Sequence, residues 1–176
     1  NYAVDAKVQP GSVIKPIIDY APGIEYYGWD SQTTFSDTPY KIEGTDFYIQ
    51  NWDRAYHGTV SMEKALAWSY NIPAVRAFET VGYERSKFFS ERLGIPVTKD
   101  EPTIAIGGNV DGVSPLQVAG AFASFGNKGY YNKPSTIVKV FNANGKELPS
   151  MRSESVKAMS EETAYLMTNM LKNVLT

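Results

Sequence analysis

The chain has 176 residues, 43% of them hydrophobic, with 17 Lys and Arg against 19 Asp and Glu, a net charge of −2 and no cysteine. This composition predicts one folded domain and excludes intrinsic disorder, a collagen-like repeat and a disulfide-stabilised scaffold. The weak negative charge gives no electrostatic footprint for nucleic acid, and the missing cysteines exclude thiolate metal sites and thiol nucleophiles.

The first part of the chain is predicted to hold one helix and a long irregular insert. Residues 1–27 have the pattern of an approach strand or loop followed by a helix, and Gln9-Pro10-Gly11 breaks the chain just before Ser12. Residues 28–58 are rich in Tyr, Trp, Asp, Thr and Gly without a sustained period, which predicts a loop. A loop of this length in a compact domain is usually functional.

Two helices are predicted directly after this insert. Ser61 opens the first, because the apolar residues that follow it recur at helical spacing. The second has Asn71 as its N-cap, a proline in its first turn and Gly82 just past its end. The junction between the two helices is therefore short.

The second half of the chain is also mainly helical by pattern. Residues 84–93 form a predicted helix, and Ser114-Pro115-Leu116-Gln117 has the residues of a capping box at the start of another. Residues 137–141 are predicted as a strand and residues 142–145 as the turn of a hairpin. Ser160 caps a final helix with a broad apolar face. The expected fold is a mainly helical chain with one small β-hairpin.

Several catalytic arrangements are missing from the sequence. His57 is the only histidine, so metal sites built on paired histidines are excluded. We interpret His57 as a solvated turn residue of the predicted loop. The chain has no phosphate-binding loop of the Walker type, and Gly107-Gly108 is interpreted as a turn or packing feature.

A lysine-assisted serine is the remaining possibility. Ser12 and Lys15 are three residues apart, so a helix starting here places both on one face with Cβ atoms roughly 5–6 Å apart. A serine hydroxyl needs a neighbouring base, and a lysine serves as one only when burial or a nearby cation keeps it neutral. The alternative is that Ser12 is a plain helix N-cap.

The same spacing occurs a second time, at Ser61 and Lys64. Here an acid stands beside the lysine, which keeps an exposed amine protonated, so we interpret Ser61 as a solvated N-cap without catalytic function. Ser12 differs because it follows Pro-Gly at a turn into an apolar helix.

Ser69-Tyr70-Asn71 is the second group of candidate residues. In a catalytic interpretation Ser69 relays a proton and the Asn71 amide, which offers a donor and an acceptor, holds the amide of a peptide substrate. In a structural interpretation Ser69 ends one helix and Asn71 caps the next.

Taken together, these residues resemble the transpeptidase domain of the penicillin-binding proteins, which uses Ser-x-x-Lys, Ser-x-Asn and Lys-Thr-Gly motifs. Further segments resemble its class A, bifunctional branch and fall in the same order along nearly the whole chain. These segments are Gln9 to Pro16, Asn51-Trp52-Asp53, Ala65-Leu66, Ser69 to Val75, Gly112 to Leu116, Gly129 to Pro134 and Glu162 to Tyr165.

The resemblance implies an α+β fold and a peptidoglycan DD-transpeptidase, with residues 1–176 as the N-terminal part of the transpeptidase domain. Ser12 would attack the D-Ala-D-Ala carbonyl of a stem peptide, or a β-lactam that becomes covalently bound to it. Lys15 would be the base, Ser69 would pass the proton to the leaving amine, and Asn71 would hold the acyl group's amide. No metal or organic cofactor is implied.

The sequence departs from the family pattern because it contains no Lys-Thr-Gly or Lys-Ser-Gly. In the family this motif lies on a strand of the central sheet and supplies one of two oxyanion donors. We therefore expect the sheet and this motif to come from a second polypeptide or another fragment of the same protein. The first residue, Asn1, and the apolar pattern at the end likewise suggest a segment of a longer protein.

Other functions remain open at this stage. A DD-carboxypeptidase or a β-lactamase would use the same acyl-serine and resolve it with water. A non-catalytic sensor would bind a β-lactam or peptide through Ser12 alone, and a purely structural helical domain would use neither motif. The resemblance places the parent protein outside the cytoplasmic membrane, anchored at the bacterial cell surface.

Overall fold

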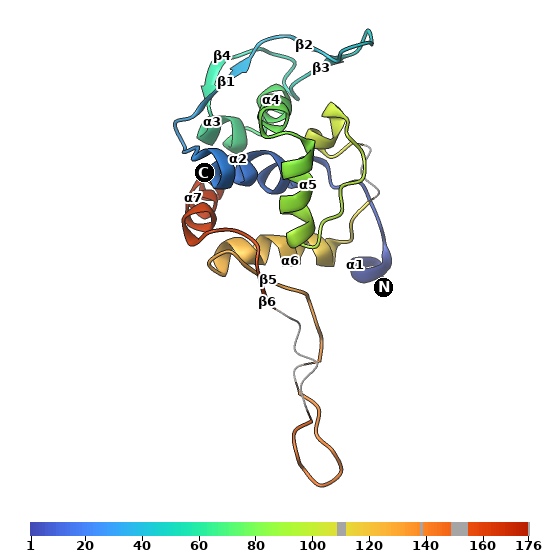
Figure 1. Cartoon of the computed structure of the whole chain (residues 1–176). Helices are drawn as coiled ribbons and strands as arrows, with labels where there is room; N and C mark the ends of the chain where they lie inside the picture. Colours follow the sequence, from blue (N-terminus) through green and yellow to red (C-terminus); the bar gives the residue numbers. More distant parts are fainter. Residues whose placement is uncertain (109–111, 138, 149–154, 176) are drawn as a thin grey trace.

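The computed structural model describes residues 1–108, 112–137, 139–148 and 155–175, and helices dominate it (Figure 1). The α-helices are α1 (Tyr2–Asp5), α2 (Ala21–Tyr27), α3 (Met62–Ala67), α4 (Asn71–Val81), α5 (Tyr83–Arg92), α6 (Pro115–Gly126) and α7 (Glu161–Lys172). Two 3-10 helices, η1 (Gly11–Ile14) and η3 (Pro102–Ile106), and a π-helix, η2 (Pro16–Tyr20), complete the helical set in this part of the chain.

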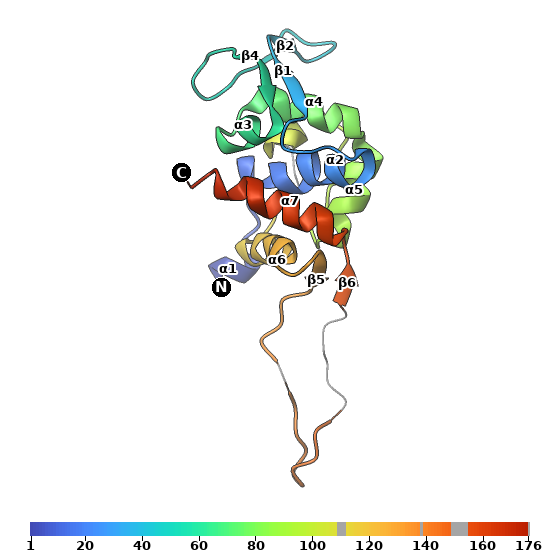
Figure 2. The same cartoon turned by 90° about the vertical axis from the view of Figure 1, so that its left-hand side faces the viewer.

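The segment from η2 into α2 is the centre of the core. Every residue of η2 is buried, and Ile17, Ile18 and Tyr20 have no exposed surface. Helices α4 and α5 pack against η2, while α7 packs against both α2 and α6 (Figure 2). Burial of these large side chains from water supplies the main driving force for the fold. The helix expected within residues 1–27 is confirmed, although it begins as 3-10 and π turns.

The predicted helix starts are largely confirmed. Ser61 accepts a hydrogen bond from the Lys64 amide, and Ser114 forms a complete capping box. Ser160 caps α7, with its hydroxyl accepting from the Thr163 amide at 3.1 Å. Helix α4 differs by one residue, because Asn71 lies inside the helix and Tyr70 is the N-cap. The Asn71 side chain makes other hydrogen bonds, described below.

The loop predicted for residues 28–58 is wrong in part. Strand β1 (Thr34–Asp37) pairs antiparallel with β4 (Gly58–Ser61), and β2 (Tyr40–Lys41) pairs with β3 (Tyr48–Ile49). Phe35 and Val60 lie opposite each other in the first pair and are both buried. These strands are too short for a periodic pattern to stand out. They are stabilised by cross-strand contacts, and β1 also packs on α4.

The predicted hairpin near residue 140 is also only partly correct. Its turn is present, because the Gly145 amide donates to the Asn142 carbonyl at 2.9 Å. The predicted strand over 137–141 includes residue 138, which lies outside the described residues, and Phe141 makes only an isolated bridge to Glu147. The paired strands of this region are β5 (Tyr130–Asn132) and β6 (Ser155–Lys157). Residues 139–148 lie well away from the helices (Figure 1).

The mainly helical, α+β character predicted for the chain is confirmed. The described residues form three separate two-stranded sheets rather than the single hairpin expected. They contain no larger sheet, and within these ranges no helix is both long and apolar enough to cross a bilayer.

Candidate active site

Ser12 lies in a tight turn at the start of η1. Gly11 precedes it with φ +60°, a left-handed conformation that suits glycine, and the Ser12 side chain is exposed to solvent. Pro10 is the N-cap of η1, so the interpretation of Ser12 as a helix N-cap is wrong. In the part of the chain that the structure describes, the Ser12 hydroxyl has no hydrogen-bond partner, which leaves it open to an incoming group.

Lys15 lies one turn further on and is 1% exposed. A 3-10 helix has three residues per turn, so side chains at positions i and i+3 lie above one another. The 3-10 geometry of η1 therefore places Ser12 and Lys15 on one side of the chain, although no hydrogen bond joins their side chains among the described residues. In enzymes, the hydrogen bond between a base and its nucleophile often tightens only when substrate is bound.

The Lys15 amine faces the junction between α3 and α4. Its Nζ atom donates to the Ser69 carbonyl at 2.7 Å and to the Asn71 Oδ1 atom at 2.8 Å. It also lies 3.1 Å from Ser69 Oγ and 3.3 Å from the Tyr70 carbonyl. The structure thus brings Lys15, Ser69 and Asn71 together in direct contact.

The charge of this amine is destabilised by its burial. Burial lowers the pKa of Lys15 from 10.5 to about 8, and the negative charge of Asp19 opposes this shift. Asp19 is itself fully buried, and neither of its carboxylate oxygens has a hydrogen-bond partner among the described residues. A pKa near 8 gives a sizeable fraction of neutral amine close to neutral pH, as a general base requires.

Ser69 adopts a strained backbone conformation between the two helices. Its φ is +53°, which is uncommon for a residue with a side chain. The Ser69 amide donates to the Leu66 carbonyl and the Tyr70 amide donates to the Ala65 carbonyl, which is the Schellman pattern for ending a helix. Serine therefore stands where glycine is usual, and its hydroxyl points to Lys15. Strain of this kind is typical of functional sites.

Asn71 has both ends of its side-chain amide engaged. Its Oδ1 atom accepts from Lys15, and its Nδ2 atom donates to the Gln50 carbonyl at 2.8 Å. The structural interpretation of Asn71 as the α4 cap is therefore wrong. In this structure the side-chain amide of Asn71 contacts the Lys15 amine and the carbonyl of Gln50, the residue before Asn51.

Asn51 was not singled out as a site residue by its chemistry, although it belongs to one of the segments that resemble the family. It is 3% exposed, and its Oδ1 atom accepts from the Asn71 amide at 2.8 Å and the Ile72 amide at 3.3 Å. Its Nδ2 atom donates to both Asp37 oxygens, at 2.8 and 2.9 Å, and to the Ala55 carbonyl at 2.9 Å.

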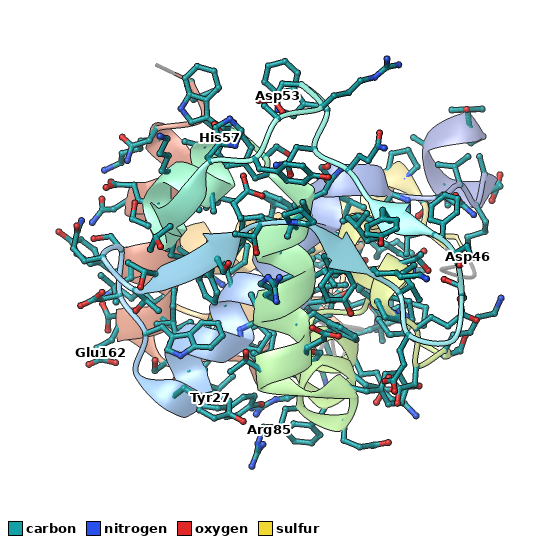
Figure 3. All side chains as sticks on the ribbon, turned by 90° about the horizontal axis from the view of Figure 1, so that it is seen from above. Tyr27, Asp46, Asp53, His57, Arg85 and Glu162 are labelled. Carbon is teal, nitrogen blue, oxygen red and sulfur yellow. The ribbon has the colours of Figure 1, made fainter. Side chains whose placement is uncertain are left out.

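The interpretation of His57 as a solvated turn residue is wrong. Its Nδ1 atom lies 2.6 Å from Asp37 Oδ2, and its Nε2 atom lies 3.1 Å from Asp53 Oδ2. The ring stacks on Tyr70 with centroids 4.1 Å apart. Figure 3 shows His57 and Asp53 on the same side of the molecule. The pairing of β1 with β4 sets Asp37 opposite Gly58, which brings His57 to the carboxylate.

The remaining candidates have structural roles. Ser61 is an N-cap, as expected, and the pair it forms with Lys64 is separate from the site. Gly107 has φ +78°, and a Cβ atom there would overlap the Gly11 backbone. The packing role predicted for the Gly107-Gly108 pair is therefore confirmed at Gly107, which holds the turn that carries Ser12. The described residues contain no cluster of His, Cys, Asp and Glu suited to a metal ion.

Comparison with known proteins identifies the family. The family model described as the penicillin binding protein transpeptidase domain matches residues 1–176. The chain belongs to the penicillin-binding protein transpeptidase family. The family resemblance of its motifs is therefore confirmed.

Named relatives agree with this assignment. Penicillin-binding protein 1A/1B of Bacillus subtilis is 44% identical over 180 residues, which are 99% of this chain and 19% of that protein. Penicillin-binding protein 1A of Streptococcus pneumoniae is 40% identical over 182 residues, which are 99% of this chain and 25% of that protein. The chain thus spans only a minor part of the length of these penicillin-binding proteins.

Solved penicillin-binding proteins share the fold. Penicillin-binding protein 1A from Haemophilus influenzae aligns with a TM-score of 0.84 and 26% identity, over 99% of this chain and 31% of that one. The imipenem acyl-enzyme complex of penicillin-binding protein A from M. tuberculosis aligns with a TM-score of 0.84 and 18% identity, over 99% of this chain and 45% of that one. The second likeness concerns the fold alone.

Proposed function

We propose that this chain carries the acyl-serine part of a peptidoglycan DD-transpeptidase site. The observation that supports it best is the buried Lys15 amine, which lies one 3-10 turn from Ser12 and contacts Ser69 and Asn71. Family membership adds to this support, because the family is named for transpeptidation and penicillin binding.

In the proposed acylation, neutral Lys15 removes the proton from the Ser12 hydroxyl as its oxygen attacks the carbonyl of the penultimate D-Ala. The carbonyl carbon gains a bond to Oγ, and the bond to the leaving amine then breaks. The proton passes from Lys15 through the Ser69 hydroxyl to the leaving nitrogen. The 3.1 Å separation between Lys15 Nζ and Ser69 Oγ suits this transfer. A β-lactam would acylate Ser12 in the same way.

Asn71 is proposed to hold the amide of the acyl group. To do so it must redirect one end of its side chain, since Lys15 and the Gln50 carbonyl now occupy both. Substrate would compete with Gln50 for the Nδ2 donor, while the Oδ1 atom would stay on Lys15. An amine from a second peptide strand would then resolve the acyl-enzyme and regenerate Ser12.

The second oxyanion donor is proposed to come from a Lys-Thr-Gly strand that this sequence does not contain. The Ser12 amide would be the first donor. We propose that the strand belongs to a second polypeptide or another fragment of the same protein, and we call this chain together with that strand the assembled enzyme. Removing one such donor costs about 10²–10³ in rate elsewhere. We further propose that the parent protein works outside the cytoplasmic membrane, where it is anchored.

Labelling of the assembled enzyme with a fluorescent penicillin tests the proposal. We expect covalent label on the wild type and none on Ser12→Ala, whereas Ser61→Ala, the matched serine of the second Ser-x-x-Lys spacing, should label normally. Label that survives Ser12→Ala would overturn the assignment. Labelling without crosslinking of D-Ala-D-Ala peptides would indicate a sensor, and hydrolysis without crosslinking would indicate a carboxypeptidase or β-lactamase.

A further inference from the structure

We infer that Asn51, oriented by Asp37 and His57, is a positioning residue that holds the Ser69–Asn71 turn on Lys15. This inference rests on the proposed function and adds residues to it that neither catalytic motif contains. We call Asp37, Asn51 and His57 the polar cluster. It joins the end of β1, the segment after β3 and the residue before β4 to the start of α4.

Asn51 acts as the N-terminal cap of α4 from a distant part of the chain. The N-cap residue itself, Tyr70, offers no side-chain hydrogen bond to the helix. The first amides of a helix lack partners within it, and leaving them buried without any is costly. Asn51 Oδ1 accepts from the first two, those of Asn71 and Ile72. The position of the α4 start therefore depends on Asn51.

Two consecutive residues, Gln50 and Asn51, accept hydrogen bonds from Asn71 at two points. Asn51 holds its backbone amide at 2.8 Å, and the carbonyl of the preceding residue, Gln50, holds its side-chain Nδ2 atom at 2.8 Å. The remaining Asn71 atom, Oδ1, faces Lys15. With its backbone and one amide end fixed, the Asn71 side chain has a single orientation towards the amine.

The other members of the cluster fix which way Asn51 points. Both Asp37 oxygens face its Nδ2 atom, so the Nδ2 end must lie towards the carboxylate and the Oδ1 end towards α4. The His57 backbone amide donates to Asp37 at 3.1 Å and its ring lies 2.6 Å from the same oxygen. Asp37 has no exposed surface, so these contacts are shielded from water.

His57 also touches the turn directly. Its ring stacks on Tyr70, the residue between Ser69 and Asn71, and its second nitrogen contacts Asp53. The cluster thus contacts Tyr70 and Asn71 of the turn, and Ser69 is the residue directly before Tyr70. Two of the four acceptors around the Lys15 amine are backbone carbonyls of that turn, so a shift of the turn moves the base relative to Ser12.

This arrangement predicts an effect on the chemical step rather than on initial binding. Positioning errors of about 1 Å at a catalytic group can cost 10²-fold in rate. In the assembled enzyme, Asn51→Ala should lower the maximal acylation rate by a fluorescent penicillin about 10-fold or more, while the half-saturating concentration changes little.

The matched control is Asn142→Ala, because Asn142 also accepts from two backbone amides, those of Asn144 and Lys146, but lies far from the site. It should acylate as the wild type does. Rates are compared under conditions where circular dichroism finds each variant folded. A folded Asn51→Ala with the wild-type maximal rate would overturn the inference.

The labelling experiment separates failure of the proposed function from failure of this inference. A wild-type enzyme that takes no label would refute the proposed function itself, whereas a labelled wild type with unaffected cluster variants would refute only this inference. If Asn51→Ala does not fold, His57→Phe carries the test. Phenylalanine keeps a ring to stack on Tyr70 and removes the ring contacts with Asp37 and Asp53, while the backbone amide of residue 57 can still donate to Asp37. We expect a several-fold lower maximal rate for it, and an unchanged rate would count against the cluster.

Discussion

Lys15 Nζ lies 3.1 Å from Ser69 Oγ, across 54 residues of sequence. The contact joins the two short motifs of the chain in one buried polar arrangement. Because the amine also faces two backbone carbonyls, its position is set by the turn at Ser69 as much as by its own helix. Substitutions on either side of this contact should therefore affect the same step.

Acylation should depend on the ionisation of Lys15. Its pKa is lowered to about 8 by burial, and only the neutral amine can accept the Ser12 proton. The rate of penicillin labelling at low concentration should therefore rise with pH, reach half its maximum at about pH 8 and then level off. A profile with its midpoint near the ordinary lysine value would contradict the burial of a functional base.

Removal of the Lys15 amine should abolish most of the activity. Lys15→Ala should slow acylation about 10²–10⁴-fold, since it deletes the proposed general base. Lys64→Ala is the matched control, because Lys64 follows Ser61 at the same spacing and lies outside the site. Equal labelling rates for the two variants would show that Lys15 has another role.

The left-handed backbone of Ser69 predicts that Ser69→Gly gains stability while it loses activity. Ser69→Gly should relieve a conformational cost of about 1–2 kcal/mol, which a side chain carries in this region. Ser69→Ala keeps that cost and loses the hydroxyl, so it should be the less stable of the two. Both should acylate slowly. Urea unfolding and penicillin labelling of the pair check this order, and an alanine variant as stable as the glycine variant would contradict it.

The close packing of Gly107 on Gly11 makes the turn that carries Ser12 sensitive to a single methyl group. Gly107→Ala adds a Cβ atom that would overlap the Gly11 backbone, so the turn carrying Ser12 must move. We expect a loss of about 1–3 kcal/mol in the free energy of unfolding and slower acylation.

Gly145→Ala is its control. Gly145 has a similar φ of +76° but nothing within 4 Å of a new Cβ atom, so it carries the backbone cost alone. Equal losses of stability for the two variants would mean that the contact with Gly11 is unimportant.

The buried carboxyl of Asp19 should reduce stability at neutral pH. Burial raises its pKa well above 3.8, with Lys15 opposing the shift, so the folded state holds a proton that the unfolded state releases. The free energy of unfolding should then fall as pH rises above the pKa that Asp19 has in the unfolded chain. Asp19→Asn should raise the free energy of unfolding at neutral pH by about 1–3 kcal/mol.

At pH values where Asp19 is ionised, the same substitution should move the acylation profile to lower pH, because only the charged carboxylate raises the pKa of Lys15. Asp46→Asn is the exposed control and should change neither property, since a surface ion pair contributes little. A less stable Asp19→Asn variant would contradict this prediction, because it would show that the carboxylate is stabilised in the folded state.

The helices and the lysine-serine pair could be predicted from sequence because their signals are local. Ser114 and Ser160 cap helices that begin directly after them, and the spacing of Ser12 and Lys15 is one helical turn. Family resemblance extended these signals to Ser69 and Asn71. The structure brings Lys15, Ser69 and Asn71 into contact and sets Ser12 one turn before Lys15, while their chemical roles stay proposals.

The polar cluster could not be predicted because every contact in it depends on pairing between distant segments. Asp37 meets His57 only through the register of β1 on β4, and neither strand has enough residues to reveal itself by alternation. Asn51 caps a helix that starts 20 residues later, so the usual search for a cap beside the helix fails. A polar side chain in an aromatic-rich segment is ordinarily taken as solvated.

The change of helix type at Lys15 has a consequence for protein engineering. The segment is wound tightly before the lysine, as η1, and loosely after it, as η2. A Ser-x-x-Lys pair grafted onto a regular α-helix would stay on one face but be offset by about 60° around the axis, since that helix has 3.6 residues per turn rather than three. To reproduce this alignment in a designed scaffold, the 3-10 turn and the π turn must be copied along with the two side chains.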